Sequence, residues 1–537
     1  MTGSPLRPTA VAMGGSAKPP VPTWGRWRTA ALVLLVVAGL TLRLWHLGAE
    51  GFADDEVHKW LAANRYLHGD FGGDDVEHPM LMKALIAVVV RFAPGTASPE
   101  ALTRLPNALS GGPLVIAVAF LGRRLFGREA GLLAAAVVAL SPAAVGYGRI
   151  AKEDVLLTLF TVLLVACLAE AHAAAEEGSD RAQSRWEIAG AAALAAMFAS
   201  KYLVFVFPLP LLAYGWLRAG GARWEVPARR WIALTAVAAA LFLALDWVVL
   251  LPSTWTYLRH YIAGDRLGDR AKSESLLFMG TLYDNLGFHY RGGVPVWFHL
   301  AFAAFKLAAP TAVLAALGLG IALVRRTPAH RLILTWLGVF LLTYAVMSAK
   351  YGRYFLPILP AFALLAAHGA VELAGWLPRR SLALAALAVL VSGNEAAASL
   401  LHLPHPRLYV NALGGGDAAV ETLFPHCDYF DAGVREAVAE IARRAEPAAQ
   451  IGSDTPWLTR YYADRDGRSD LAIERILPSS VCRRDVPCYV IVQTGRRYWH
   501  NEAVLDRLAP LPTWTTVDVG GRPAVKVYRV EGGAFGG

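Results

Sequence analysis

Residues 51–87, GFADDEVHKWLAANRYLHGDFGGDDVEHPMLMKALIA, place a dense group of carboxylates and histidines directly after an apolar run. That run, residues 29–47, approaches the length of about 20 residues that a helix needs to cross a bilayer. Charged side chains are costly in and beside membrane spans, so they are candidates for function by default. The stretch therefore predicts a membrane protein whose first outer loop carries polar chemistry.

The composition supports this interpretation. The chain has 537 residues, 55% hydrophobic and only 17% charged, whereas soluble proteins carry about 25% charged residues. Apolar runs of near-spanning length recur at 29–47, 104–121, 130–147, 155–172, 188–202, 203–217, 232–251, 308–324, 332–349, 355–373 and 382–401. We therefore expect a polytopic α-helical membrane protein with about 11 spans.

The net charge of +9 raises the question of nucleic acid. The arginines instead follow alternate apolar runs in clusters, which is the positive-inside pattern of membrane topology. The clusters are Arg123, Arg124 and Arg128; Arg218, Arg223, Arg229 and Arg230; Arg325, Arg326 and Arg331; and Arg379 and Arg380. The pattern argues against a nucleic-acid partner and predicts a multi-pass protein of the plasma (inner) membrane.

The same rule sets the predicted topology. Residues 1–28 are rich in proline and glycine and are expected to be disordered and cytoplasmic, followed by an uncleaved anchor. All arginine clusters lie on the cytoplasmic side only if residues 80–94 form an interfacial helix rather than a span. By the same argument, residues 294–307 are predicted to form an interfacial helix. The transmembrane region then extends over 29–401, with outer loops at 51–94 and 252–307.

Residues 402–537 are expected to form a small extracytoplasmic α/β domain. The run GVREAVAEIARRAE from Gly433 has helical periodicity, while CYVIVQ from Cys488 and AVKVYRV from Ala524 have the composition of strands. Cys482 and Cys488 are candidates for a disulfide in an oxidising compartment, which leaves Cys427 unpaired. The domain carries no catalytic motif.

The predicted topology brings distant polar residues to one membrane face. They are Asp54, Asp55, Glu56 and His58; Glu77 and His78; Arg104; Arg149, Lys152, Glu153 and Asp154; and Lys350 with Arg353. Lysine and arginine bind phosphate oxygens, and a carboxylate accepts a proton from a hydroxyl nucleophile. Together these groups suit transfer from a lipid-phosphate carrier, in which the cations stabilise the charge of the leaving phosphate.

Other interpretations of the same residues stay open. Asp54, Asp55, Glu153 and Asp154 could cap helices, and Lys350 and Arg353 could anchor spans at the interface. A transporter or flippase for a polyprenyl-linked sugar would also have many spans and charges near the membrane, although no internal repeat is evident. A scaffold whose tail binds partners is a further alternative. Nucleotide-binding glycine motifs, zinc spacings and a nucleophile elbow are absent from the sequence.

Several motifs resemble protein O-mannosyltransferases and their bacterial relatives, which are polyprenyl-phosphate-sugar-dependent glycosyltransferases. That family has an Asp-Glu pair after the first span, here Asp55-Glu56, and then a His-Pro-Pro-Leu-x-Lys-type motif. The latter is HPMLMK from His78, with Met80 replacing the second proline. Further similar segments are RLPNALSG from Arg104, GRIAKEDVLLTLF from Gly148, NLGFHYRGGVPVWFHLAFAAFK from Asn285 and SAKYGRYFLPILP from Ser348. The resemblance covers residues 51–373.

This resemblance implies a C-type glycosyltransferase fold. It implies transfer of mannose or another hexose from polyprenyl phosphate to an outer-face acceptor, with inversion. Asp55 would be the acceptor-activating base or its close partner, with Glu56 beside it. Arg104, Lys350 and Arg353 would contact the lipid phosphate, and His58, Glu77, His78 and Asp154 are the pocket candidates. Arg149 and Lys152 are added to the candidate phosphate-binding residues because of their position alone.

The acceptor stays open between protein serine or threonine and a cell-envelope glycan or lipid. No cofactor is expected, although Asp55, Glu56 and Asp154 could hold a divalent ion through oxygen ligands.

Overall fold

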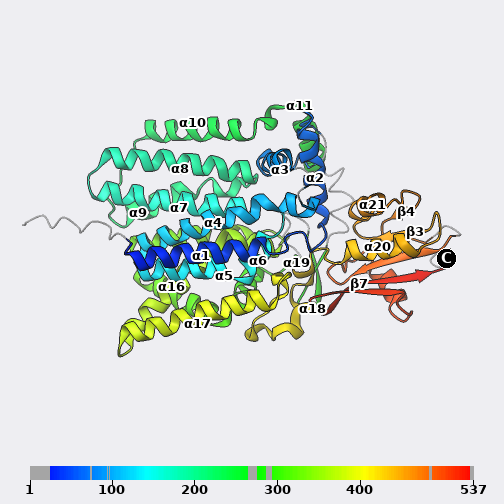
Figure 1. The fold of residues 1–537 in the computed structure, drawn as a ribbon. Coiled ribbons are helices and arrows are strands. Elements are labelled where there is room, and N and C mark those ends of the chain that lie inside the picture. The colour runs from blue at the N-terminus through cyan, green and yellow to red at the C-terminus, as the bar shows by residue number, and fades with distance from the viewer. Residues whose placement is uncertain are drawn as a thin grey trace, which may run out of the picture.

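The computed structural model describes residues 24–72, 75–93, 95, 97–263, 275–285, 293–479, 481–482 and 486–531. Long helices form a bundle, and a smaller domain with a β-sheet lies at one end of it (Figure 1). One hydrophobic core extends from Leu32 in the bundle to Val527 in the sheet domain, so the two parts pack together. The predicted disorder of the N-terminus concerns residues 1–23, and part of the predicted second outer loop concerns 264–274 and 286–292; these lie outside the described residues.

Within the described residues, seven helices are long and apolar enough to cross a membrane. They are α1 (Arg26–Leu44), α4 (Pro99–Phe126), α7 (Asp154–Glu176), α10 (Ala228–Leu245), α15 (Pro328–Val346), η3 with α16 (Gly352–Ile358 and Leu359–Trp376) and α17 (Arg380–Leu401). An eighth span is formed by α5 (Arg128–Leu140) and α6 (Pro142–Gly148) if this pair, bent by 52°, crosses as one. Pro142 explains the break, because proline lacks the N–H that would continue the hydrogen bonding of α5.

The other predicted runs are represented by α8 (Asp180–Ser200), η1 (Val204–Val206) with α9 (Leu209–Ala219), and α14 (Ala309–Arg325). These helices are shorter or less apolar than the seven, so the prediction of about 11 spans stays a prediction. The chain is a multi-pass membrane protein with seven or eight candidate spans among its described residues. Its orientation in the membrane also stays a prediction.

Small residues let the bundle helices approach one another closely. A Cβ atom added to Gly122 of α4 would lie 2.7 Å from the Cα atom of Gly131 in α5, so only glycine fits there. Association in a bilayer gains no hydrophobic free energy, and close backbone approach therefore supplies much of the packing attraction.

Short elements lie between the bundle and the sheet domain. They are α2 (Asp54–Tyr66), α3 (Met80–Phe92), η2 (Trp247–Leu250), α11 (Pro252–Ala263), β1 (Ser275–Phe278), β2 (Thr281–Asp284) and α13 (Phe298–Lys306). Figure 1 shows α2, α3 and α11 at the end of the bundle that faces the sheet domain. The 13 residues of α3 extend over about 20 Å, too short to cross a hydrocarbon core of about 30 Å. The helix is therefore too short to be a span, and the interfacial position expected for 80–94 stays a prediction.

The C-terminal domain contains a five-stranded mixed sheet in the order β4-β3-β5-β7-β6. Its strands are β3 (Gln450–Ser453), β4 (Ala472–Glu474), β5 (Cys488–Gln493), β6 (Thr515–Val519) and β7 (Arg522–Val530). β3 pairs in parallel with β4 and β5, while β7 pairs antiparallel with β5 and β6. The helices are α20 (Val434–Arg444), α21 (Pro456–Arg465) and α22 (Glu502–Leu508), preceded by η4 (Pro406–Leu408), η5 (Ala412–Gly414), η6 (Gly416–Ala419), α18 (Val420–Leu423) and α19 (Pro425–Tyr429).

The sequence prediction for this domain is largely confirmed. The expected helix is α20, and the two expected strands are β5 and β7. Cys482 and Cys488 form the predicted disulfide, and Cys427 is free and buried.

Buried polar contacts dock the C-terminal domain onto the loop between α1 and α2 and onto the bundle. The hydroxyl of Tyr462 donates to Glu100 at 3.0 Å and accepts the backbone N–H of Phe52 at 2.6 Å. Lys306 of α13 pairs with Asp428 of α19 at 2.7 Å, and both side chains are buried. These contacts fix the domain against the loop that carries the predicted catalytic residues.

Candidate functional site

A polar cavity of about 260 Å³ lies where the loops at one end of the bundle meet the C-terminal domain. The bundle side contributes Ala53, Asp54, Asp55, Glu77, His78, Glu153, Lys201, Ser275, Asn285, Tyr351, Arg353 and Tyr354. The C-terminal domain contributes His426, Phe430, Asp431, Asp454, Arg475, Arg496, Tyr498 and His500. Of the predicted site residues, Asp55, Glu77, His78 and Arg353 line the cavity. Asp154 does not line it but pairs with Lys201, which does.

Asp55 stands in the first turn of α2. Its carboxylate pairs with the ammonium group of Lys152, and 43% of the Asp55 side chain is exposed while that of Lys152 is buried. Lys152 itself does not line the cavity. A half-exposed carboxylate at the cavity wall is accessible to a substrate.

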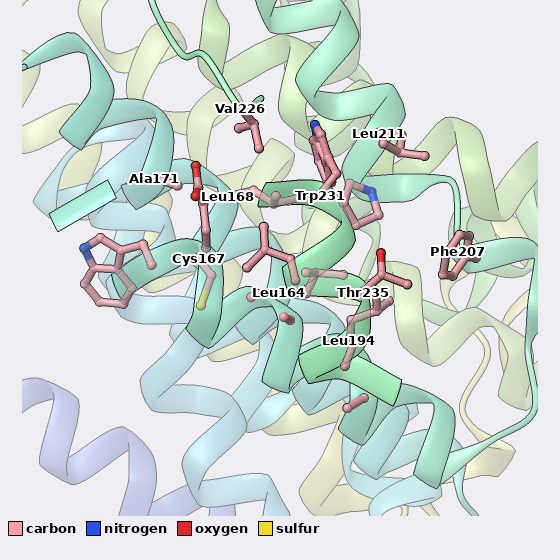
Figure 2. Close-up of a pocket in the computed structure, with 18 of the residues that line it drawn as sticks. Leu164, Cys167, Leu168, Ala171, Leu194, Phe207, Leu211, Val226, Trp231 and Thr235 are labelled. Carbon is pink, nitrogen blue, oxygen red and sulfur yellow. The ribbon is translucent and has the colours of Figure 1, made fainter. Parts of the chain in front are cut away.

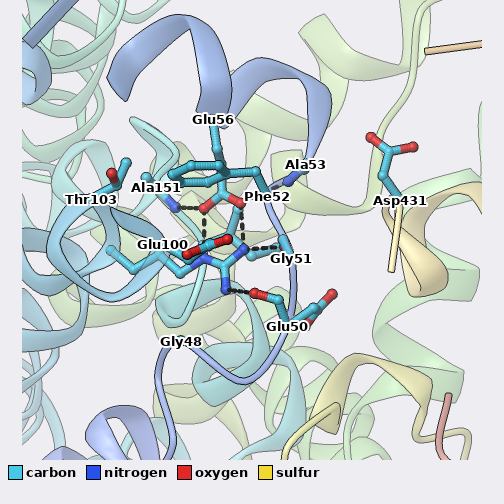
Figure 3. Close-up of polar contacts among 12 residues, drawn as sticks. Gly48, Glu50, Gly51, Phe52, Ala53, Glu56, Glu100, Thr103, Ala151 and Asp431 are labelled. Atoms are coloured by element: carbon cyan, nitrogen blue, oxygen red, sulfur yellow. Dashed lines mark hydrogen bonds and ion pairs between the residues drawn. The ribbon is translucent and has the colours of Figure 1, made fainter. Parts of the chain in front are cut away.

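Glu56, the next residue, faces a different environment. Arg104 donates to both of its oxygens, from Nε at 2.9 Å and from Nη2 at 2.6 Å. Glu56 also accepts the N–H groups of Ala53 and Ala151, and Arg104 further donates to carbonyl oxygens of Glu50 and Gly51 (Figure 3). Both side chains are buried and neither lines the cavity. The pair therefore holds the start of α2 and the loop before it against α4.

Asp154 is the first residue of α7, and two cationic side chains lie beside its carboxylate at the bundle side of the cavity. Its carboxylate accepts from Lys201 at 2.7 Å, and the Nε of Arg353 lies 3.7 Å away. The ammonium group of Lys201 lies 4.4 Å from the ring centre of Tyr354. The guanidinium of Arg353 lies 4.4 Å from the ring centre of Tyr351. Because one carboxylate pairs with two cations, this cluster has a net positive charge. The rings of Tyr351 and Tyr354 stabilise the two cations through cation–π contacts.

A second cluster surrounds Lys59. Its ammonium group lies 2.9 Å from Glu153 and 3.6 Å from Asp75, and His78 Nδ1 lies 2.8 Å from Asp75. Burial alone would raise the pKa of Asp75, but Lys59, His78 and Lys83 outweigh it and hold that pKa well below its usual range. The carboxylate at this point is therefore ionised across the physiological range.

Asp75, His78 and Glu153 are also the one group of three possible metal ligands that lies close together among the described residues. Lys59 and Lys83 both approach Asp75, at 3.6 and 3.8 Å, so ammonium groups already take the place of a cation. Asp55, Glu56 and Asp154, the ligands considered from the sequence, are each paired with a different cation.

The remaining predicted residues lie away from the cavity. Arg149 donates to the carbonyl oxygens of Leu42 in the last turn of α1 and of Trp45 and His46 just after it. Lys350 is buried and donates to the carbonyl oxygens of Val294, at 2.8 Å, and Met347. His58 forms an edge-to-face contact with Trp457 of α21, with ring centres 6.2 Å apart.

Two groups of cavity residues went unrecognised in the sequence. Lys201 could have been found, because it is a lone lysine at the end of an apolar run, where charge is costly. Asp431 and Arg496 of the C-terminal domain carried no signal, since they lie in short loops between predicted elements. They form a bidentate ion pair with N···O distances of 2.7 Å.

A separate apolar cavity of about 380 Å³ lies between α7, α8, α9 and α10 (Figure 2). Leu164, Leu168, Leu194, Phe207 and Trp231 are among its lining residues, and Glu187 is the one charged residue in that lining. It shares no lining residue with the polar cavity, but the two approach each other on α8. Phe198 lines the apolar cavity, and Lys201, one turn further along, lines the polar one.

Part of the chain matches a known protein family. Residues 77–249 match the family model described as dolichyl-phosphate-mannose-protein mannosyltransferase. No curated protein matches the chain.

The fold is shared with solved membrane transferases. ArnT from Cupriavidus metallidurans bound to undecaprenyl phosphate is similar with a TM-score of 0.51 and 15% identity, over 93% of this chain and 98% of that one. The Archaeoglobus fulgidus oligosaccharyltransferase in complex with Zn and sulfate gives a TM-score of 0.52 and 12% identity, over 82% of this chain and 62% of that one.

The chain has the polytopic fold of ArnT, and it has a polar cavity between the loops at one end of the bundle and the C-terminal domain. The family match over residues 77–249 and the shared fold together indicate a membrane glycosyltransferase that uses a polyprenyl-phosphate sugar donor.

Proposed function

We propose that this protein transfers mannose or another hexose from a polyprenyl-phosphate carrier to an acceptor hydroxyl on the extracytoplasmic face of the plasma membrane, with inversion at the anomeric carbon. The observation that carries the proposal is the polar cavity, which has a reachable carboxylate, Asp55, on one wall and the Lys201–Arg353 cation pair on another.

In the proposed reaction, Asp55 accepts the proton of the acceptor hydroxyl while that oxygen attacks the anomeric carbon. The bond between the anomeric carbon and the phosphate oxygen breaks, and its electron pair leaves with the polyprenyl phosphate. Lys201 and Arg353 stabilise the charge that develops on that phosphate. Lys152 and Asp154 hold these groups in place as the buried partners of Asp55 and of the two cations.

The isoprenoid chain of the carrier would fit the apolar cavity. A phosphate at Lys201 would stand at the end of α8, and the apolar cavity begins near Phe198 on the same helix. An isoprenoid chain is apolar and flexible, so it suits a cavity lined by leucine and aromatic side chains. That ArnT was solved with undecaprenyl phosphate supports a donor of this chemical class.

The other predicted residues take different parts in this proposal. Glu77 and His78 line the cavity and are available to bind sugar or acceptor hydroxyl groups. Glu56, Arg104 and Arg149 hold the loops rather than the phosphate, since their polar atoms are used by buried neighbours.

The test is transfer by purified protein in lipid nanodiscs, given radiolabelled polyprenyl-phosphate mannose and a membrane extract of the source cells. Label is expected in protein, in glycan or in lipid, which identifies the acceptor class. The Asp55→Asn variant is expected to lose about 10²–10⁴-fold in rate, the usual contribution of a general base. Asp70→Asn, an exposed acid outside the cavity, is the matched control and should keep the rate.

Absence of transfer with any polyprenyl-phosphate sugar would overturn the proposal. Movement of the lipid-linked sugar between leaflets without its consumption would support a flippase in its place.

A further inference from the structure

One turn of the C-terminal domain that lines the polar cavity has an unusual backbone conformation. Phe430 and Asp431, between α19 and α20, both have positive φ angles, of 45° and 66°. Two successive non-glycine residues in the left-handed region are uncommon, and such strain collects at functional sites. Both residues line the polar cavity, so the turn places two side chains of this domain opposite α2.

Asp431 contacts the start of α2 directly. Its Oδ2 accepts the backbone N–H of Asp54 at 3.0 Å, and Asp54 is the first residue of the helix that carries Asp55. The first N–H groups of a helix lack partners within it, and the positive end of the helix dipole attracts a carboxylate. Asp431 therefore caps α2 from outside the helix, and Figure 3 shows it apart from the Glu56 cluster.

Asp431 is itself held by its own domain. Arg496 donates to both of its oxygens at 2.7 Å, and Gln493 donates to Oδ1 at 2.9 Å. Burial would raise the pKa of Asp431, but Arg496 outweighs this effect and keeps that pKa below its usual value. The cap is thus a fixed, ionised carboxylate.

Phe430 contacts the other half of the site. The guanidinium carbon of Arg353 lies 5.9 Å from the centre of its ring, within the range of a cation–π interaction. The same two-residue turn therefore touches the helix start that bears Asp55 and one of the two cations of Asp154.

We propose that the Phe430-Asp431 turn, braced by Arg496, is a positioning device through which the C-terminal domain sets the placement of Asp55 relative to Arg353. Asp431 and Arg496 act as positioning residues for the transfer and do not react themselves. This inference rests on the proposed function, because Asp55 and Arg353 have their roles only in that reaction.

The expected consequence is a selective loss of turnover. Without the cap, the first turn of α2 loosens, while Lys201 and the apolar cavity that receive the donor are untouched. Asp431→Ala is expected to lower kcat about 10–100-fold, as a displacement of about 1 Å can do, with the donor KM within about threefold of wild type.

Asp431→Asn provides a variant that keeps the backbone. Asparagine tolerates the left-handed conformation as aspartate does, and its side-chain oxygen can still accept the Asp54 N–H. Only the charge that holds Arg496 is lost, so kcat is expected to fall less than in Asp431→Ala. Glu446→Ala, which removes the exposed Glu446–Arg529 ion pair of the same domain, is the matched control and should leave kcat unchanged.

The second measurement is hydrogen exchange of the first-turn amides of α2 in the full-length protein without donor. Exchange is expected to rise at least tenfold in Asp431→Ala and to stay at the wild-type rate in Glu446→Ala. Unchanged exchange, or raised exchange with unchanged kcat, would overturn the positioning role. If the wild type transfers no sugar at all, the proposed function fails, and the exchange difference alone decides whether Asp431 holds α2.

Discussion

Asp55 and Glu56 are adjacent in the sequence and stand in two different environments. Asp55 points to the polar cavity and is 43% exposed, with one buried lysine beneath it. Glu56 is fully buried and accepts four hydrogen bonds, two from Arg104 and one each from Ala53 and Ala151. The difference follows from the helix, because successive residues are about 100° apart around its axis.

The carboxylates of an acidic motif beside a membrane can therefore have two different roles. A carboxylate with every lone pair engaged holds a structure together, whereas a carboxylate with open oxygens can receive a proton. The same division runs through the cations. Arg104, Arg149 and Lys350 are engaged by carbonyl or carboxylate oxygens of the fold and do not line the cavity. Lys201 and Arg353 share the single carboxylate of Asp154 and do line it.

The largest expected effect comes from breaking the buried pair. Glu56→Gln leaves the Arg104 guanidinium without its counter-charge, and loss of one partner of a buried pair costs about 3–5 kcal/mol. That is a large part of the 5–15 kcal/mol that stabilises a typical domain. We expect much less folded protein and a lower melting temperature, measured by size-exclusion chromatography and thermal unfolding in detergent.

A double variant, Glu56→Leu with Arg104→Met, tests the assignment from the other side. It removes both charges and is expected to recover part of the stability lost in Glu56→Gln. A Glu56→Gln protein that melts like wild type but transfers no sugar would instead make Glu56 a catalytic residue.

A smaller effect is expected at the cavity cations. Lys201→Met removes a charged donor from the proposed phosphate position, and hydrogen bonds to charged groups contribute about 1.5–3 kcal/mol. Affinity for polyprenyl phosphate should therefore fall about 10–100-fold. Binding to nanodisc-embedded protein, with the exposed Lys526→Met variant as control, measures this; equal affinities would exclude Lys201 from the phosphate site.

The smallest effect concerns Lys350 and pH. Burial lowers the pKa of Lys350 to about 8, whereas a lysine in the unfolded chain titrates near 10.4. The folded state therefore carries a cost for the ammonium charge below pH 8, and this cost disappears as the pH rises from 8 towards 10. The melting temperature of wild type relative to Lys350→Met should rise by a few degrees between pH 7.5 and 9.5. A constant difference would contradict the lowered pKa.

The membrane part and the motif-bearing loop could be predicted from sequence because their signals are local. Apolar length marks spans such as α1, α4 and α7, and the short α3 follows from charge balance across its flanks. The topology rule predicts that residues from distant loops meet at one face. Asp55, Glu77, His78 and Arg353 do line one cavity.

The sequence could not separate cavity residues from structural ones. Whether Glu56 or Asp55 faces the cavity depends on how α2 is rotated, and that rotation is set by Arg104, Ala151 and Asp431, all distant in the chain. Nor could the C-terminal domain be placed over the cavity, because its docking uses single contacts such as Tyr462 with Glu100 rather than a motif.

The central claim is that the lipid-linked sugar is consumed in the polar cavity, between Asp55 and the Lys201–Arg353 pair. The most direct test is an experimental structure of the Asp55→Asn protein with a polyprenyl-phosphate sugar. The account predicts the phosphate beside Lys201 and Arg353, the anomeric carbon facing residue 55, and the isoprenoid chain along α8 toward Phe198. A phosphate bound instead at Arg104 or Arg149, or a sugar outside the cavity, would contradict it.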